Sequence, residues 1–382
     1  MGRMGWGHPH LSPADTWKHL FDSASTSNDP EQSQIASELN RPETDSLFTP
    51  SRSSGHTEIL RLLREHDPDT ISIVAIGPLT NLALAAAEDP ETFLRAREIV
   101  VMGGNIDHPG NVRHQPPLKF QPNSNTAAIA EPAFRLTKQP PGPIRDMLNK
   151  RNQMTPVAEF NTFADSVAAA RLYALTSPNP ATTMPPVPPA PPGQPEGQNP
   201  PPHLAPYPEK LSRQLKVTLF PLDITERHIL TRGEFRAAIH SDLGAGSPMA
   251  EWVGAFMEAT FQKVESLHPG VTGDGVSLQL HDPMCVWYCM TADEPKASQG
   301  GKWEVLEGED IRVETSGQWT RGMCVVDRRS RTKRADDDKG EVPGDTDGWL
   351  AGGHGNRLQR CVGSPDEKGF GGWMLGRVLG ST

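Results

Sequence analysis

The chain has 382 residues, of which only 35% are hydrophobic, and it contains 38 prolines and 35 glycines. Its formal net charge of −10 argues against a surface that binds a phosphate backbone, so we expect no nucleic acid partner. No apolar run reaches the roughly 18 residues that a membrane-spanning helix needs, so we expect no membrane partner. The four cysteines lack zinc spacing, and the N-terminus lacks a secretory apolar region. These features favour a reducing, cytoplasmic location.

The apolar residues cluster in blocks, and this clustering predicts the domain organisation. Residues 1–56 show little pattern, and we expect a poorly ordered N-terminal segment. Residues 57–330 carry the pattern of one domain, interrupted by inserts at 112–153 and 178–208. The second insert is rich in proline, which predicts an extended, mobile loop. Residues 331–382 are expected to be a C-terminal extension with a closing helix near the end.

The first elements of the domain alternate between helix and strand. Residues 58–66 have helical spacing, and 71–76 (ISIVAI) are a continuous apolar run, typical of a strand covered on both faces. Gly77 and Pro78 then lead into an Ala/Leu-rich helix that Pro90 should end. Residues 98–104 (EIVVMGG) are a second buried strand. This β-α-β succession implies parallel strands and an α/β fold.

The later elements continue this pattern. In chain order we expect a loop that becomes a helix at about Ala164, a third strand at 217–225, a long helix at 248–268, a helix that begins near Pro283, a hairpin at 311–329 and a weak helix at 369–379. The predicted fold is a single α/β domain with a mostly parallel open sheet, helices on its flanks and long disordered insertions.

Ligands of open α/β sheets bind beyond the carboxyl ends of the strands, so the polar residues there are candidates for chemistry. Thr80 follows the first strand, and Asn111 lies beyond the glycines that end the second. Taken singly, each candidate has a structural explanation. Asp282, ahead of Pro283, has the position of a helix N-cap. Gly103 and Gly104 suit a turn with positive φ. Glu159 and Asn161 suit a loop that enters a helix, His281 a packed histidine, and Asp223 a structural role.

Together these segments form an ordered set of motifs. The sequence contains IVAIGPLTNLALAA, EIVVMGGN, PGN at 109–111, PVAEFN at 156–161 and HDP at 281–283. In this order they resemble the inosine–uridine nucleoside hydrolases. The resemblance covers about 57–111, 154–176 and 210–330 and supports the predicted fold.

The resemblance implies hydrolysis of the N-glycosidic bond of a ribonucleoside with a bound Ca²⁺, a cation that prefers oxygen ligands. It gives Asp282 and the main-chain carbonyl of Thr80 to the metal, and His281 to the protonation of the departing base. Cleavage of the bond builds negative charge on the base, and a nearby proton donor lowers that barrier. The ribose-binding positions are Asn111, Glu159, Asn161 and Met102.

The sequence departs from this family in three places: ahead of Ile71, at 112–153, and ahead of HDP, where the tyrosines that some relatives place against the base are absent. The family's D-x-D-x-G-x-D-D motif is absent ahead of Ile71, so the chain is expected to begin after the family's first strand and to bind Ca²⁺ weakly. The segment 112–153 separates Asn111 from Glu159 by 159 − 111 = 48 positions. It is either an unspliced intron or a surface loop, and a loop of this length has the reach to displace Asn111 from Glu159.

Three hypotheses about activity remain open at this stage. The chain is a nucleoside hydrolase with impaired activity, a non-catalytic ribose- or nucleoside-binding protein that works without metal, or a truncated and inactive homologue that folds incompletely. The preferred base stays undetermined. A homo-oligomer is expected by analogy with the family only.

Overall fold

The structure is a computed structural model that describes residues 53–111, 155–187 and 202–380, without Ala245, Pro269, 294–300, Asp336, Lys339 and Glu341. The predicted N-terminal segment before residue 53, the predicted insert at 112–153 and the middle of the proline-rich insert lie outside these described residues.

The centre of the fold is a five-stranded sheet with the order β1-β2-β3-β9-β6. Its strands are β1 (Ser72–Ala75), β2 (Glu98–Met102), β3 (Val217–Phe220), β9 (Leu358–Gly363) and β6 (Glu304–Glu309). β1, β2, β3 and β9 run parallel to one another, and β6 runs antiparallel to β9. The predicted α/β fold with a mostly parallel sheet is therefore confirmed.

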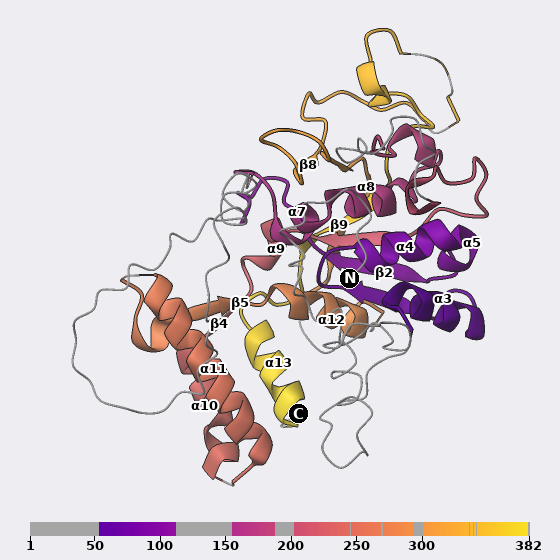
Figure 1. The fold of residues 1–382 in the computed structure, drawn as a ribbon. Coiled ribbons are helices and arrows are strands. Elements are labelled where there is room, and N and C mark those ends of the chain that lie inside the picture. The colour runs from indigo at the N-terminus through magenta and orange to yellow at the C-terminus, as the bar shows by residue number, and fades with distance from the viewer. Residues whose placement is uncertain are drawn as a thin grey trace, which may run out of the picture.

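Helices cover both faces of the sheet (Figure 1). The helices are α3 (Gly55–Glu65), α4 (Thr80–Glu88), α5 (Pro90–Phe93), α7 (Phe160–Ala164), α8 (Ser166–Ala174), α9 (Leu222–Thr225), α10 (Arg232–Gly244), α11 (Pro248–Leu267), α12 (His281–Thr291) and α13 (Phe370–Leu379). The short strands are β4 (Ile229–Thr231), β5 (Ser277–Gln279), β7 (Arg312–Val313) and β8 (Cys324–Val325). None of the described helices is both long and apolar enough to cross a bilayer.

Strand β2 shows how the sequence builds two cores, because successive side chains of a strand point to opposite faces. Ile99 and Val101 pack into one core with residues of α3, α4 and α8. Val100 and Met102 pack into the other core with residues of α12 and α13. All five residues of β2 are buried, as its continuous apolar run predicts.

Strand β1 departs from the expectation that both its faces are covered. In the described part of the chain it is the first strand of the sheet, with β2 as its only neighbour. Ser72 is exposed, and the next three residues are half-buried. An apolar run predicts strand formation, but it does not show whether a second neighbour is present.

The segment 331–382, which we treated as an extension, contributes β9 and α13 to the fold. β9 lies inside the sheet between β3 and β6, and Phe370 and Leu375 of α13 belong to the core with α12. The end of the proline-rich insert is also packed. Arg171 of α8 donates hydrogen bonds to the carbonyls of Leu204 and Ala205, so the prediction of a wholly extended, mobile loop is wrong at this end.

Candidate functional site

The turn after β2 brings the backbone close to the segment 155–162. Gly104 has a φ of +75°, which confirms the predicted turn with positive φ. A Cβ atom at Gly104 would lie 2.7 Å from the Sγ of Cys324, and one at Gly103 would lie 3.4 Å from Oε2 of Glu159. A side chain at Gly104 would therefore push the turn away from Cys324, and one at Gly103 would be in contact with Glu159.

Glu159 joins this turn to helix α7. Its Oε2 accepts hydrogen bonds from the amides of Gly104 at 2.8 Å and Thr162 at 2.9 Å, and its Oε1 accepts one from Asn161 at 2.7 Å. Glu159 is the N-cap of α7, so the helix begins at Phe160 and the prediction of a start near Ala164 is wrong. Burial raises the pKa of Glu159, and the three amide donors only partly oppose that effect.

Asn161 and Asn111 complete the cluster around α7. The side-chain amide of Asn161 donates to the main-chain oxygen of Met102 at 3.1 Å and lies 3.4 Å from its sulfur. The side-chain oxygen of Asn111 accepts a hydrogen bond from the amide of Phe160 at 2.8 Å. Hydrogen bonds therefore link Met102, Asn161 and Glu159 at the carboxyl end of β2, and Asn111 joins them through Phe160, the residue between Glu159 and Asn161. We call Met102, Asn111, Glu159 and Asn161 the amide cluster.

Helix α9 lies beside this cluster and contains a residue that we expected to end a strand. The third strand stops at Phe220, and Asp223 is the second residue of α9. The Asp223 carboxylate accepts hydrogen bonds from the amides of Ile106 at 2.8 Å, Asp107 at 2.6 Å and His108 at 3.1 Å. Pro221 ends β3 because it cannot donate to the ladder.

The same helix contacts His281. Nδ1 of His281 lies 2.8 Å from the hydroxyl oxygen of Thr225, which is fully buried. Burial lowers the pKa of His281, while Glu226 and Asp282 oppose that shift and His108 adds to it. Because an unperturbed histidine titrates near pH 6.5, a lowered pKa favours the neutral imidazole at pH 7.

Asp282 is placed differently from the prediction. Leu280 is the N-cap of α12, and Asp282 is the second residue of that helix, with no side-chain capping hydrogen bond. Asp282 is one of the residues that line a hollow of about 420 Å³, whose walls are mostly apolar and include Ile76, Trp287 and Trp373. Burial raises the pKa of Asp282, and His281 opposes that effect only in part.

Thr80 is the first residue of α4, and its hydroxyl donates to the Asp165 carboxylate at 2.7 Å. Asp165 in turn caps α8 by accepting from the amide of Ala168 at 3.0 Å. The side chain of Thr80 therefore ties α4 to α8. The hollow beside Asp282 is not lined by Thr80 or by the amide cluster.

The residues that the structure describes do not form a calcium site by themselves. Among them, no group of three or more His, Cys, Asp or Glu side chains is arranged to hold a metal ion. Asp282 is the one carboxylate predicted as a ligand, and the hollow that it lines has no other Asp or Glu in its lining. Calcium prefers six to eight oxygen ligands, so the described donor set does not fit it.

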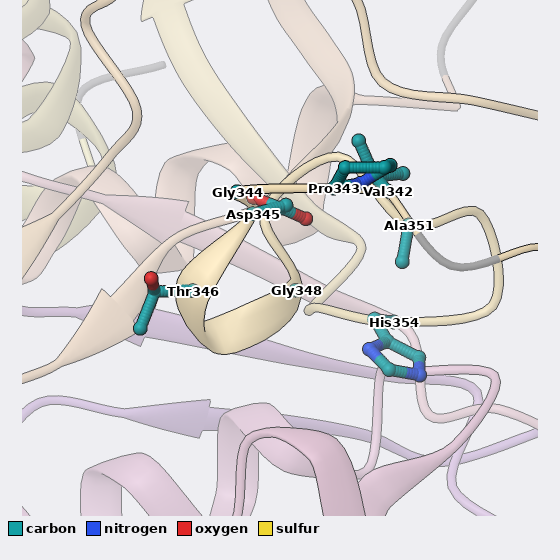
Figure 2. Close-up of a pocket in the computed structure, with 8 residues that line it drawn as sticks. All are labelled: Val342, Pro343, Gly344, Asp345, Thr346, Gly348, Ala351 and His354. Carbon is teal, nitrogen blue, oxygen red and sulfur yellow. The ribbon is translucent and has the colours of Figure 1, made fainter.

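A second hollow, of about 500 Å³, lies in the C-terminal loops (Figure 2). It is lined by Val342, Pro343, Gly344, Asp345, Thr346, Gly348, Ala351 and His354. None of the predicted site residues belongs to its lining. The carboxylate of Asp345 is already engaged by the amides of Trp349 and Leu350.

Sequence reasoning missed Thr225 and gave Asp223 only a structural role. Asp223 and Thr225 both lie in α9 and contact the loop after β2 and His281, respectively. The signal was present, because both follow the carboxyl end of a buried strand, where open α/β sheets bind their ligands. Among the polar residues that follow the third strand, Asp223 was interpreted as structural and Thr225 was not considered.

Comparison with known proteins identifies the family. The family model described as inosine-uridine preferring nucleoside hydrolase matches residues 4–345. An uncharacterised protein of Schizosaccharomyces pombe is 27% identical over 287 residues, which cover 74% of this chain and 60% of the relative. The non-specific ribonucleoside hydrolase RihC of Klebsiella pneumoniae is 23% identical over 266 residues, which cover 70% of this chain and 53% of the relative. The chain thus spans between half and two thirds of the length of these relatives.

Solved structures share the fold. A plant nucleoside hydrolase, PpNRh1, superposes with a TM-score of 0.50 at 17% identity, over 90% of this chain and 72% of the other. A purine-preferring ribonucleoside hydrolase of Gardnerella vaginalis gives a TM-score of 0.50 at 16% identity, over 90% of this chain and 70% of the other. Because the family model covers most of the sequence, the chain belongs to the inosine-uridine preferring nucleoside hydrolase family.

Proposed function

We propose that this protein hydrolyses the N-glycosidic bond of ribonucleosides to ribose and free base. The observation that carries the proposal is the amide cluster at the carboxyl end of β2. There Asn161 donates to Met102 and to Glu159, and Asn111 accepts from Phe160, which lies between Glu159 and Asn161. Family membership supports it, because the family is defined by nucleoside hydrolases. The relatives differ in their stated substrates, so purine and pyrimidine nucleosides are both candidates.

In this proposal the amide cluster binds the sugar. The side-chain nitrogen of Asn161 donates to the main-chain oxygen of Met102. None of the described residues donates to the side-chain oxygen of Asn161, so a ribose hydroxyl can donate to it. Glu159 has up to four lone-pair positions, of which backbone amides occupy three. A hydrogen bond from the side chain of Thr162 also reaches this carboxyl, and Glu159 is only 1% exposed, so no position is left for a hydroxyl of the sugar. In this proposal Glu159 holds the cluster together, and the Asn161 oxygen fixes the sugar without involving the base.

We assign the proton that the departing base needs to His281. Its Nδ1 is held by Thr225, and the described residues leave Nε2 without a hydrogen-bond partner. Negative charge develops on the base as the glycosidic bond breaks, and a proton delivered there lowers the barrier. Because burial lowers the pKa of His281, the protonated form is the minority at pH 7, and this form delivers the proton; its lowered pKa makes it the stronger acid.

The family resemblance also implies Ca²⁺, with Asp282 and Thr80 as ligands. The described donors do not fit that ion, so we assign it no step. The same observation favours a second candidate function, which is binding of ribose or a nucleoside without metal and without hydrolysis. The amide cluster serves both functions, and the two differ in whether free base is released.

We further propose a cytoplasmic location and self-association. The four cysteines are free thiols, and three of them are buried, as expected in a reducing compartment.

The proposal of self-association rests on exposed apolar side chains. Ile76, Val286 and Met290 are each more than 40% exposed and line one apolar hollow next to β1. An apolar surface beside a strand edge favours contact with another chain.

The test is the release of free base from inosine and from uridine, measured by chromatography with calcium and with EDTA. We expect release by the wild-type chain and a loss of about 100-fold or more in His281→Asn, as for removal of a general acid. His240→Asn, at an exposed position of α10, is the control and should keep wild-type rates. Nucleoside binding without any release would replace hydrolysis with the binding function.

A further inference from the structure

The loop that connects β2 to Asn111 has neither helix nor strand between residues 103 and 111. Its backbone amides therefore need partners from elsewhere, because an unpaired amide in a partly buried loop costs free energy. Three consecutive amides, those of Ile106, Asp107 and His108, meet on the single carboxylate of Asp223 at 2.8, 2.6 and 3.1 Å. Successive amides that converge in this way form a concave anion-binding arrangement.

Further contacts hold the same loop from its other sides. The side-chain nitrogen of Asn105 donates to the carbonyls of His108 at 2.7 Å and Val157 at 2.9 Å. Arg328 donates to the carbonyl of Ile106 at 2.5 Å. Asp223 is the member of this set that satisfies three amides at once, so it restrains more of the loop than any other described side chain.

The loop determines where Asn111 lies. Asn111 accepts from the amide of Phe160, the first residue of α7, whose amide has no acceptor within the helix. The protection of this one amide therefore reports directly whether Asn111 is in place. Asp223 contacts neither Asn111 nor Phe160, so any effect of Asp223 on that amide must pass through the loop.

We propose that Asp223 is a positioning residue of the sugar site, which fixes the loop 105–111 so that Asn111 meets α7. The predicted effect on ribose binding rests on the proposed function. The role of Asp223 in fixing the loop does not depend on that function. Asp223 does not touch the sugar in this account. It acts through Asn111.

The geometry explains why a carboxylate is required. Oδ1 accepts from Asp107 and His108, and Oδ2 accepts from Ile106. An asparagine of the same size keeps one oxygen and presents an NH₂ group to the other amide, which puts two donors face to face. Burial raises the pKa of Asp223, but the amide donors outweigh burial and the net shift is downward. The carboxylate is therefore ionised at neutral pH.

The experiment compares Asp223→Asn with wild type by amide hydrogen exchange and by titration with ribose. We expect the Phe160 amide to exchange at least about tenfold faster in the variant, and the Kd for ribose to rise by about tenfold, the effect of losing one charge-assisted hydrogen bond. Asn111→Ala removes the acceptor of the Phe160 amide, so it gives the exchange rate expected when this hydrogen bond is lost completely. If Asp223→Asn does not fold, Asp223→Glu, which keeps the charge but moves the oxygens, is compared in its place.

Asp366→Asn is the matched control, because Asp366 also accepts from two backbone amides, those of Lys368 and Gly369, in a loop of the C-terminal segment. It should change neither readout. Unchanged protection of Phe160 in Asp223→Asn would overturn the positioning role. Absence of ribose and nucleoside binding in the wild type would instead overturn the proposed function, and the exchange result would still decide the role of Asp223.

Discussion

The side-chain oxygen of Asn111 accepts a hydrogen bond from the amide of Phe160 at 2.8 Å, although the two residues are 49 positions apart. Of the segment that separates them, residues 112–154 lie outside the described residues. The displacement of Asn111 that a long insertion made conceivable is not observed. Loop-closure entropy rises only slowly with length, so a long surface segment leaves such a contact possible.

The turn after β2 gives a stability prediction. Gly104→Ala places a side chain at a φ of +75° and 2.7 Å from the Sγ of Cys324. Gly344→Ala is the control, because Gly344 has the same φ of +75° but open space around it. We expect the control to lose about 1–2 kcal/mol from the backbone alone, and Gly104→Ala to lose a further 1–3 kcal/mol, roughly, from overpacking. Equal losses in denaturant unfolding would contradict the close packing of this turn.

Thr225 gives a prediction about proton delivery. Thr225→Val removes the hydroxyl that holds Nδ1 of His281. For inosine we expect kcat to fall by about tenfold or more, because the imidazole is no longer held in its orientation. For p-nitrophenyl riboside, whose leaving group needs no proton, kcat should stay nearly unchanged. Thr225→Ser should restore the inosine rate. A similar fall with both substrates would show that Thr225 supports the fold rather than His281.

The pH dependence of stability follows from Asp223. Its pKa is lowered in the folded chain, so the unfolded chain binds a proton first as pH falls, and folding stability declines. Arg360 and Arg328 are the cations near this loop. The stabilisation is fully present above the unfolded pKa of about 3.9 and is lost as pH falls through the folded value. The difference in free energy of unfolding between wild type and Asp223→Asn should be constant from pH 7 to 5 and shrink below about pH 4. A difference that does not change with pH would contradict the lowered pKa.

Calcium binding tests the disagreement between the family resemblance and the described donors. With Asp282 as the one predicted carboxylate ligand, we expect a Kd of about 10⁻³ M or weaker, and little calcium-dependent rise in Tm. Calorimetric titration with CaCl₂ measures it directly. Micromolar binding that is lost in Asp282→Asn would show that the ligand set is complete.

Strands β1, β2 and β3 and several helices could be predicted from periodicity and breakers, because buried parallel strands are apolar runs and proline or glycine marks their ends. Strands β4, β5, β6 and β9 and helix α10 were not predicted. β1, β2 and β3 formed where the runs occur. Which strands lie next to each other in the sheet could not be predicted. The position of β9 between β3 and β6, and the half-exposed state of β1, depend on pairing between segments that are distant in the sequence.

The site was predicted in part. The resemblance named Met102, Asn111, Glu159 and Asn161, and the structure links them through backbone amides and carbonyls. It could not reveal that Glu159 is a helix cap, because capping depends on where the helix begins. The contacts of Asp223 could not be predicted, because its partners are backbone amides more than 100 positions away, which no side-chain pattern records.

Ribose binding by the amide cluster is the most direct test of the account. Calorimetric titration of ribose into wild type, Asn161→Ala and Asn179→Ala compares a cluster residue with an exposed asparagine outside it. We expect saturable binding by the wild type and by Asn179→Ala, and a loss of about tenfold or more in affinity for Asn161→Ala. Equal affinity of all three proteins for ribose, or no binding by the wild type, would contradict the assignment of the sugar site.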